Sequence, residues 1–185
     1  MKKELRKKFK RLRSELLLKE EKSLKICNNF LNSDTYKNAK IILCYAALKD
    51  EVNTDLIIKK SLEDGKVIAL PRCIDKNGLM IYYIINSLDD LEMGSFGISE
   101  PNTDCAELKD FADSVCIVPA LSFDKYGYRL GYGKGFYDRF LENYIGCSVG
   151  LCYNELLSLN LPINEFDRSV NIVITDCDKF FCKGE

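Results

Sequence analysis

Glycines, cations and a carboxylate are concentrated in one short segment of this 185-residue chain. The segment holds Gly127, Arg129, Gly131, Gly133, Lys134, Gly135 and Asp138. Glycine lets a backbone approach a ligand closely and adopt positive φ angles without steric cost. Backbone N–H groups in such loops, and at the start of a helix that follows them, point toward anions. The segment therefore predicts a site for a phosphate group, with a metal ion nearby.

Neither of two common phosphate-binding motifs describes this segment. A P-loop would need Ser or Thr after Gly133-Lys134, where Gly135 stands, and a dinucleotide fingerprint would need glycine in place of Phe136. A glycine-rich turn without a ligand is the alternative, and for a lone pair of glycines we would favour it. Four glycines together with two cations, a carboxylate and three aromatic residues favour a binding site instead.

The composition restricts the chemistry further. The chain contains no histidine, which excludes Ser-His and Cys-His nucleophilic pairs, histidine bases and imidazole metal ligands. Its nine cysteines form no C-x-x-C pair, and several lie in apolar runs, so we expect neither a zinc site nor a disulfide framework. Phosphoryl transfer is compatible with this composition, because positioning and charge neutralisation dominate its catalysis.

Length and charge indicate a soluble globular protein. The hydrophobic content of 46% and the charged content of 30% fit one domain with a sizeable core. No apolar run approaches the roughly 20 residues of a membrane span, so we expect a cytoplasmic protein without a membrane partner. Residues 1–13 carry eight Lys or Arg and one Glu, although the net charge of the chain is −1. No known nucleic-acid-binding module is visible, so we expect no nucleic-acid partner, and we expect a monomer.

Short apolar runs alternate with helical patterns along the chain. A helix is predicted over residues 2–31, interrupted near Leu18–Glu20, with its cations on the faces away from an apolar stripe. Further helices are predicted over 54–63, 87–91 and 136–144, and strands over 40–45, 66–71, 79–85, 114–118, 146–152 and 172–175, with a turn at Asn77-Gly78. This alternation predicts an α/β fold with a mainly parallel central sheet and an N-terminal basic helix. Glu51 would then follow the carboxyl end of a strand, where open α/β sheets bind ligands.

The glycine-rich segment resembles the signature of the 5-formyltetrahydrofolate cyclo-ligase family, also called methenyltetrahydrofolate synthetases. The resemblance rests on RLGYGKGFYDRFL over Arg129–Leu141, on Phe123-Asp124 and Gly127 before it, and on GSFGISEP over Gly94–Pro101. It extends over nearly the whole chain. It implies a Rossmann-like three-layer fold in a single domain over residues 1–185.

The resemblance also implies an activity. This would be the ATP-dependent cyclisation of 5-formyltetrahydrofolate to 5,10-methenyltetrahydrofolate, with release of ADP and phosphate, via a phosphorylated formyl oxygen. ATP would be the co-substrate, Mg²⁺ the metal, and 5-formyltetrahydrofolate the small-molecule partner. Two residues depart from the family pattern: Phe136 replaces a tyrosine of GYGGGYYD or GRGKGYYD, and Phe166 replaces the histidine that usually precedes Asp167. Glu100 of the second motif is expected outside the core, in a structural or catalytic role.

Each site residue receives a role from the resemblance. The residues implied to bind ATP are Lys2, Lys3, Glu4, Leu5, Arg6, Arg129, Leu130, Gly131, Tyr132, Gly133, Lys134, Gly135, Phe136 and Tyr137. The residues implied to contact the folate are Ala46, Glu51, Tyr132 and Phe136. The ligands implied for Mg²⁺ are Asp138 and Asp167. The residues implied to be catalytic are Lys134, Arg129, Glu51 and Tyr137.

Two other classes of function stay open from the residues alone. A sugar-phosphate isomerase or an acyl-CoA transferase on a similar fold would bind phosphate without needing ATP or the basic helix. A non-catalytic binding module would dock its basic helix on RNA or on an acidic partner.

Overall fold

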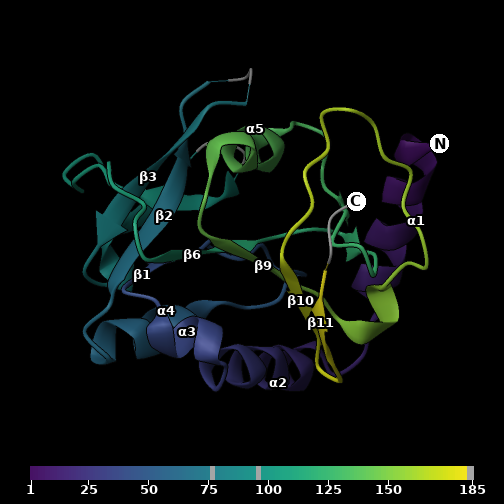
Figure 1. The fold of residues 1–185 in the computed structure, drawn as a ribbon, viewed down its shortest axis with the longest axis horizontal. Coiled ribbons are helices and arrows are strands. Elements are labelled where there is room, and N and C mark those ends of the chain that lie inside the picture. The colour runs from purple at the N-terminus through teal and green to yellow at the C-terminus, as the bar shows by residue number, and fades with distance from the viewer. Residues whose placement is uncertain (76–77, 95–96, 183–185) are drawn as a thin grey trace.

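The computed structural model describes residues 1–75, 78–94 and 97–182, and a seven-stranded sheet runs through its centre (Figure 1). Its strand order is β11-β10-β9-β6-β1-β2-β3. The strands are β1 Ile41–Leu43, β2 Val67–Cys73, β3 Met80–Ile85, β6 Ser114–Val118, β9 Cys147–Leu151, β10 Ile172–Ile174 and β11 Lys179–Phe181. The inner strands pair in parallel, whereas β3 and β11 pair with their neighbours in antiparallel fashion. The predicted mainly parallel sheet is confirmed.

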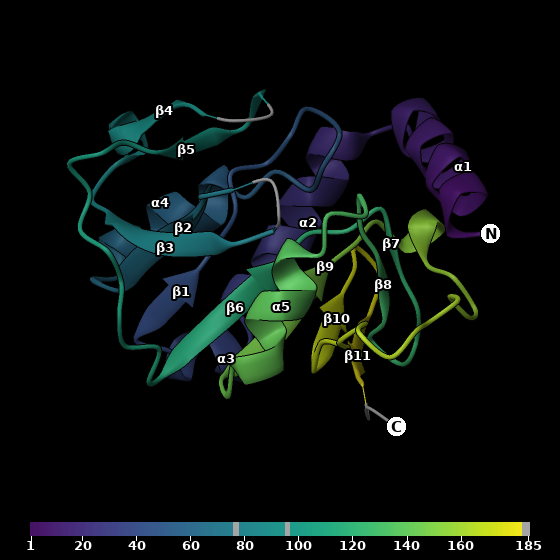
Figure 2. The same ribbon diagram turned by 90° about the horizontal axis from the view of Figure 1, so that it is seen from above.

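Helices cover both faces of this sheet. α2 (Lys19–Leu31), α3 (Asp34–Asn38) and α4 (Asp55–Glu63) lie on one face, and α5 (Phe136–Asn143) lies on the other (Figures 1 and 2). Helices on both faces leave the central strands without solvent contact, and every residue of β6 is buried. The three-layer α/β arrangement is therefore also confirmed.

The basic N-terminal segment forms α1 (Lys2–Glu15), which is separate from α2. Leu16 is extended and Leu18 has a φ of 57°, so the helix is interrupted close to the predicted position. α1 lies beside the sheet, against β8 (Arg129–Leu130) and a single 3₁₀ turn, η3 (Asn154–Leu156) (Figure 2). This placement brings the basic helix next to the glycine-rich segment.

Two short hairpins lie outside the central sheet, and neither was predicted. β7 (Ser122–Phe123) pairs with β8, and β4 (Leu91–Met93) pairs with β5 (Ser99–Pro101), after a 3₁₀ turn, η1, at residues 88–90. β6 therefore leads into the β7–β8 hairpin before α5 begins, where one continuous loop was expected. Strands this short show no alternating pattern in a sequence. Asn77 of the predicted turn and Ser95-Phe96 of the second family motif lie outside the described residues.

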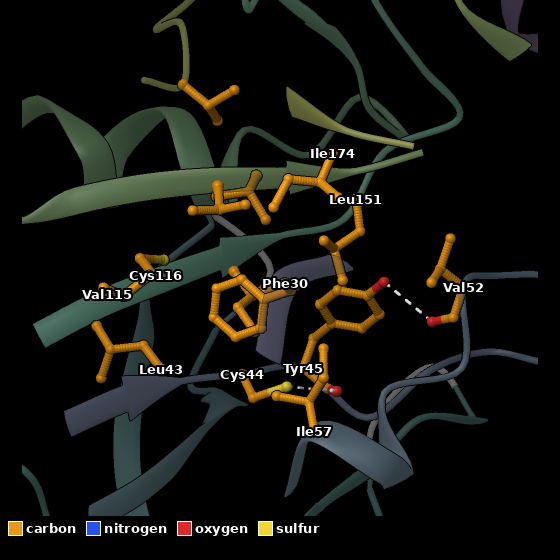
Figure 3. Packing of buried hydrophobic residues seen from close by; sticks show 14 of the residues in the cluster. Phe30, Leu43, Cys44, Tyr45, Val52, Ile57, Val115, Cys116, Leu151 and Ile174 are labelled. Atoms are coloured by element: carbon orange, nitrogen blue, oxygen red, sulfur yellow. Dashed lines mark hydrogen bonds between the residues drawn. The ribbon is translucent and has the colours of Figure 1, made fainter. Parts of the chain in front are cut away.

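The loop after β1 carries Glu51 and is fixed to the hydrophobic core. Tyr45 Oη donates a hydrogen bond to the Val52 carbonyl at 3.0 Å (Figure 3). Thr54 Oγ1 donates to the Tyr45 carbonyl at 2.6 Å. Tyr45, Val52 and Thr54 are all buried, so these two bonds close the loop at its base. Glu51 is thereby held at the carboxyl end of the sheet.

The expectation that Glu100 lies outside the core was wrong. This residue, in β5, is only 3% exposed, and it accepts a hydrogen bond from the backbone N–H of Cys73 at 3.1 Å. The bond ties β5 to the end of β2, which explains why a carboxylate is buried there.

All nine cysteines are free thiols. Over the described residues, the helices are too short or too polar to cross a membrane.

Candidate active site

Glu51 is a buried carboxylate at the centre of a hydrogen-bond network. Its side chain is 6% exposed, and Oε1 accepts a hydrogen bond from Tyr132 Oη at 3.1 Å, with Arg13 Nη1 3.8 Å away. Oε2 accepts a bond from the backbone N–H of Leu48 at 3.0 Å. The Tyr153 hydroxyl donates to the Glu51 carbonyl at 3.0 Å. A buried charge is tolerated when it is paired and hydrogen-bonded, and Glu51 meets both conditions.

The glycine-rich segment is anchored by Asp124, at the turn between β7 and β8. Asp124 Oδ1 accepts hydrogen bonds from the backbone N–H groups of Tyr126 and Tyr128, each at 3.0 Å. Gly127 has a φ of +85°, and a Cβ there would lie 2.3 Å from the Val170 carbonyl oxygen. A side chain does not fit at this crossing of two backbones, so glycine is required. The base of the segment is thus fixed by the Phe123-Asp124 and Gly127 pattern of the sequence.

Two cations of α1 reach across to the predicted ligand-binding residues. Arg6 Nε donates to the Gly131 carbonyl at 2.9 Å, and its guanidinium carbon lies 3.0 Å from the position that a Cβ on Gly133 would take. Lys2 Nζ lies 2.5 Å from Asp167 Oδ2. The N-terminal helix therefore places two positive charges over the glycine-rich segment and beside Asp167.

Arg129 and Asp138 form an ion pair next to this segment. Arg129 Nη2 donates to Asp138 Oδ1 at 2.5 Å, and Nη1 donates to the Arg168 carbonyl at 2.6 Å. The Arg129 side chain is 5% exposed, and its burial lowers the pKa of the guanidinium while Asp138 opposes that shift. Both terminal nitrogens of Arg129 are thus engaged with protein groups. Its contact with a phosphate stays a prediction.

Asp138 contacts the backbone of Arg168, the residue that follows Asp167 in the sequence. The Arg168 N–H donates to Asp138 Oδ1 at 3.2 Å, and Asp167 Oδ2 accepts a bond from the Asn164 N–H at 2.6 Å. Among the described residues, no cluster of three or more His, Cys, Asp or Glu side chains could hold a metal ion. Mg²⁺ is usually held by one or two carboxylates together with phosphates and water, so a pair of aspartates suits this ion.

The remaining predicted residues differ in exposure. Tyr132 is 41% exposed, and Lys134 is exposed with its carbonyl accepting a bond from Arg139 at 2.9 Å. Burial raises the pKa of Tyr137 well above its ordinary value, so its hydroxyl stays protonated. Phe136 lines a groove of about 710 Å³ between α5 and the start of β3. Three further predicted residues lie in or against the hydrophobic core: Leu5, Ala46 and Leu130. Lys3 and Glu4 are exposed on α1, and Gly135 is the residue from which α5 starts.

Comparison with known proteins identifies the family. The sequence profile of the 5-formyltetrahydrofolate cyclo-ligase family matches residues 1–176. The chain belongs to that family. It is 28% identical to the 5-formyltetrahydrofolate cyclo-ligase of Mus musculus, over 92% of this chain and 89% of that protein. It is 30% identical to the protein of the same name from Escherichia coli K12, over 74% of this chain and 78% of that protein.

Solved structures resemble this cyclo-ligase family member over 95% or more of its length. The NMR structure of Aquifex aeolicus 5,10-methenyltetrahydrofolate synthetase has a TM-score of 0.84 and 31% identity, and covers 100% of this chain and 94% of that chain. The synthetase from Mycoplasma pneumoniae, at 22% identity and a TM-score of 0.75, covers 95% of this chain and 98% of that chain and shows the likeness of fold. Family membership favours a cyclo-ligase over an isomerase, an acyl-CoA transferase or a binding module.

Two residues of the candidate cyclo-ligase site were not predicted. Arg13 was expected with the other cations of residues 1–13 on the faces away from the apolar stripe, which was wrong, because it is 6% exposed and contacts Glu51 and Tyr132. The position of Arg13 in the sequence could have indicated its burial, because it follows Phe9 by four residues and therefore lies on the same face of α1. Tyr153, which holds the Glu51 backbone, has no feature in the sequence that separates it from a core tyrosine.

Proposed function

We propose that this chain is a 5-formyltetrahydrofolate cyclo-ligase, which converts 5-formyltetrahydrofolate and ATP into 5,10-methenyltetrahydrofolate, ADP and phosphate. Its family and the names of its relatives support this assignment. At the site, the observation that carries it is the 3.1 Å hydrogen bond from Tyr132 Oη to Glu51 Oε1. This bond joins the segment assigned to ATP with the loop assigned to the folate, so the two substrates would meet there.

The reaction needs ATP because the formyl group on N5 is an amide, whose oxygen is a poor leaving group. In our proposal this oxygen attacks the γ-phosphorus of ATP, and ADP departs. N10 then adds to the formyl carbon, the carbon–oxygen bond breaks, and phosphate leaves as the N10 proton is lost to water. No side chain forms a bond with a substrate, which suits a chain without histidine. The protein would position the two substrates and neutralise charge.

The phosphates of ATP would lie against the glycine-rich segment. Gly133 and Gly135 have φ values of +98° and +74°, a backbone conformation that other residues rarely adopt and that would let N–H groups face the phosphates. Arg6, which lies over Gly133, would supply positive charge together with the exposed Lys134. Lys2 would add a further positive charge from the start of α1.

The folate would lie between the loop after β1 and the aromatic residues of the glycine-rich segment. Glu51 would accept hydrogen bonds from the pterin or from the N10–H group, while Ala46 would give an apolar contact. Tyr132 and Phe136 would offer flat aromatic surfaces to the pterin or the aminobenzoyl arm. Tyr137, held neutral by its burial, would act as a hydrogen-bond donor.

Mg²⁺ would be held by Asp138 and Asp167 together with the phosphates of ATP. When bound, the ion would neutralise negative charge on those phosphates. Arg129 would orient Asp138 through their 2.5 Å contact, and Lys2 would do the same for Asp167.

Absorbance in the near ultraviolet tests this function, because the methenyl product has its own chromophore. Purified protein mixed with 5-formyltetrahydrofolate and magnesium chloride should give a rising trace only after ATP is added. Lys134→Ala should reduce the rise while the protein stays folded, since Lys134 is exposed. A flat trace from folded native protein would exclude the ligase function.

A further inference from the structure

Arg13, in the last turn of α1, has a guanidinium enclosed by three other segments. Its side chain is 7% exposed, and Nη1 lies 3.8 Å from Glu51 Oε1. Nη1 also donates to the Ala120 carbonyl at 3.3 Å, and Nη2 donates to the Tyr132 hydroxyl. The guanidinium carbon lies 5.6 Å from the centroid of the Tyr132 ring. One side chain therefore contacts the loop after β1, the segment between β6 and β7, and the glycine-rich segment.

Arg13, Tyr132 and Glu51 form a hydrogen-bonded chain in which each donor and acceptor is fixed. A guanidinium can only donate and a carboxylate can only accept, so the phenol between them must be neutral and must donate to Glu51. Burial and the neighbouring Glu51 raise the pKa of Tyr132, with Arg13 acting in the opposite direction, and the phenol stays protonated. The Tyr132 hydroxyl thus accepts a hydrogen bond from Arg13 and directs its own proton at Glu51.

We propose that Arg13 is a positioning residue, which fixes the orientation of the Glu51 carboxylate for the folate, both directly and through Tyr132. The inference rests on the proposed function, in which Glu51 accepts hydrogen bonds from the folate. Without Arg13, the buried carboxylate keeps only the neutral donors Tyr132 Oη and the Leu48 N–H, and the Tyr132 hydroxyl loses the donor that orients it.

The same face of α1 serves the ATP side of the site. Arg6 and Arg13 are seven residues apart, which is two helical turns, so they project from one face. Arg6 contacts Gly131 and Arg13 contacts Tyr132, the next residue. The position of α1 therefore affects both the residues proposed to bind phosphate and the residues proposed to bind the folate.

A positioning role and a purely structural role make different predictions for a second substitution. If Arg13 acts through Glu51, then a protein that already lacks the carboxylate has nothing left for Arg13 to position. If Arg13 only supports the fold, its loss weakens folate binding to the same extent whether or not the carboxylate is present.

The test is a double-mutant cycle with Arg13→Gln, Glu51→Gln and the double variant. The dissociation constant for 5-formyltetrahydrofolate is measured for each by isothermal titration calorimetry. We expect each single substitution to weaken binding by about tenfold or more, as for a lost charged hydrogen bond. The double variant should bind within about twofold of Glu51→Gln. A further loss of about tenfold in the double variant would overturn the inference.

Two more substitutions separate positioning from folding. Arg13→Lys keeps the charge beside Glu51 but loses the planar fork, so it should recover part of the affinity. If Arg13→Gln does not fold, Arg13→Lys takes its place in the cycle, with the same non-additivity expected. Arg11→Gln, at an exposed position on the same helix, should leave the affinity unchanged.

The inference and the function fail in different ways. A native chain that forms no methenyl product with ATP would contradict the proposed function. An active native chain in which the Arg13 and Glu51 effects add would contradict only the role of Arg13.

Discussion

The hydroxyl of Tyr132 donates a hydrogen bond of 3.1 Å to the carboxylate of Glu51, across 81 residues of sequence. Tyr132 belongs to the glycine-rich segment, and Glu51 belongs to the loop that Tyr45 and Thr54 fix to the core. The bond therefore anchors the glycine-rich segment to a loop that is itself fixed to the core of the sheet.

Tyr132→Phe should lower kcat/KM for 5-formyltetrahydrofolate by about tenfold, because it removes the bond to Glu51 and keeps the ring. The absorbance assay measures this effect. Tyr126→Phe, in the turn of the same hairpin, is the matched control and should keep native activity. Equal activity of Tyr132→Phe and the native chain would show that the bond has no part in catalysis.

Arg6→Gln should raise the KM for ATP by about tenfold with less effect on the KM for the folate, since Arg6 lies over Gly133. Steady-state rates at varied ATP concentration give this value. Lys7→Gln changes the charge by the same amount at an exposed neighbouring position and should leave both constants unchanged. If both substitutions raised the KM for ATP equally, Arg6 would act only through its charge and not through its position over Gly133.

Gly133→Ala should abolish ATP-dependent activity, whereas Gly65→Ala should not. Both glycines have positive φ, +98° and +72°, so either alanine should destabilise the fold by about 1 kcal/mol. A Cβ at Gly133 would also lie 3.0 Å from the Arg6 guanidinium, while one at Gly65 meets nothing within 4 Å. Urea unfolding and the absorbance assay, applied to both variants, separate strain from loss of the site. Full activity in Gly133→Ala would contradict the role of this loop.

Asp138→Asn should destabilise the protein by about 2 kcal/mol, because it leaves the enclosed Arg129 guanidinium without its carboxylate. It should also raise the magnesium concentration needed for half-maximal activity. Glu142→Gln removes the partner of a more exposed arginine, Arg168, and should change stability by less than about 0.5 kcal/mol. Unchanged magnesium dependence in Asp138→Asn would remove Asp138 from the proposed metal site.

The stability of the protein should fall as the pH rises above 9. Burial raises the pKa of Cys27, Cys116 and Cys152 from 9.0 to about 12. These thiols stay protonated in the folded chain while they ionise in the unfolded one, so their contribution is complete below pH 9.0 and is lost as the pH approaches 12. Each thiol should cost about 1.4 kcal/mol per pH unit in that range.

Urea unfolding between about pH 8 and about pH 10 measures this slope. Cys152→Ala removes one buried thiol and should therefore make the unfolding free energy fall less steeply with pH. Cys177→Ser, at an exposed position, should leave this pH dependence unchanged. A constant unfolding free energy over this range would contradict the burial of these thiols.

The sheet was predictable because its inner strands are continuous apolar runs, and the N-terminal helix was predictable from its apolar stripe. The β7–β8 hairpin was not, since two-residue strands have no period. Arg13 was missed because a cation in a basic helix resembles its solvated neighbours. The buried state of Glu51 depends on Arg13, Tyr132 and Tyr153, which come from three distant segments. No local pattern around Glu51 contains that information.

The coupling of ring closure to ATP cleavage is the central claim, and one sample can test it. Methenyl absorbance and phosphate release are recorded together after ATP is added to native protein with 5-formyltetrahydrofolate and magnesium. Equal molar amounts of phosphate and methenyl product are expected, with no phosphate released when the folate is left out. Phosphate release without the folate, or methenyl formation without ATP, would contradict the account.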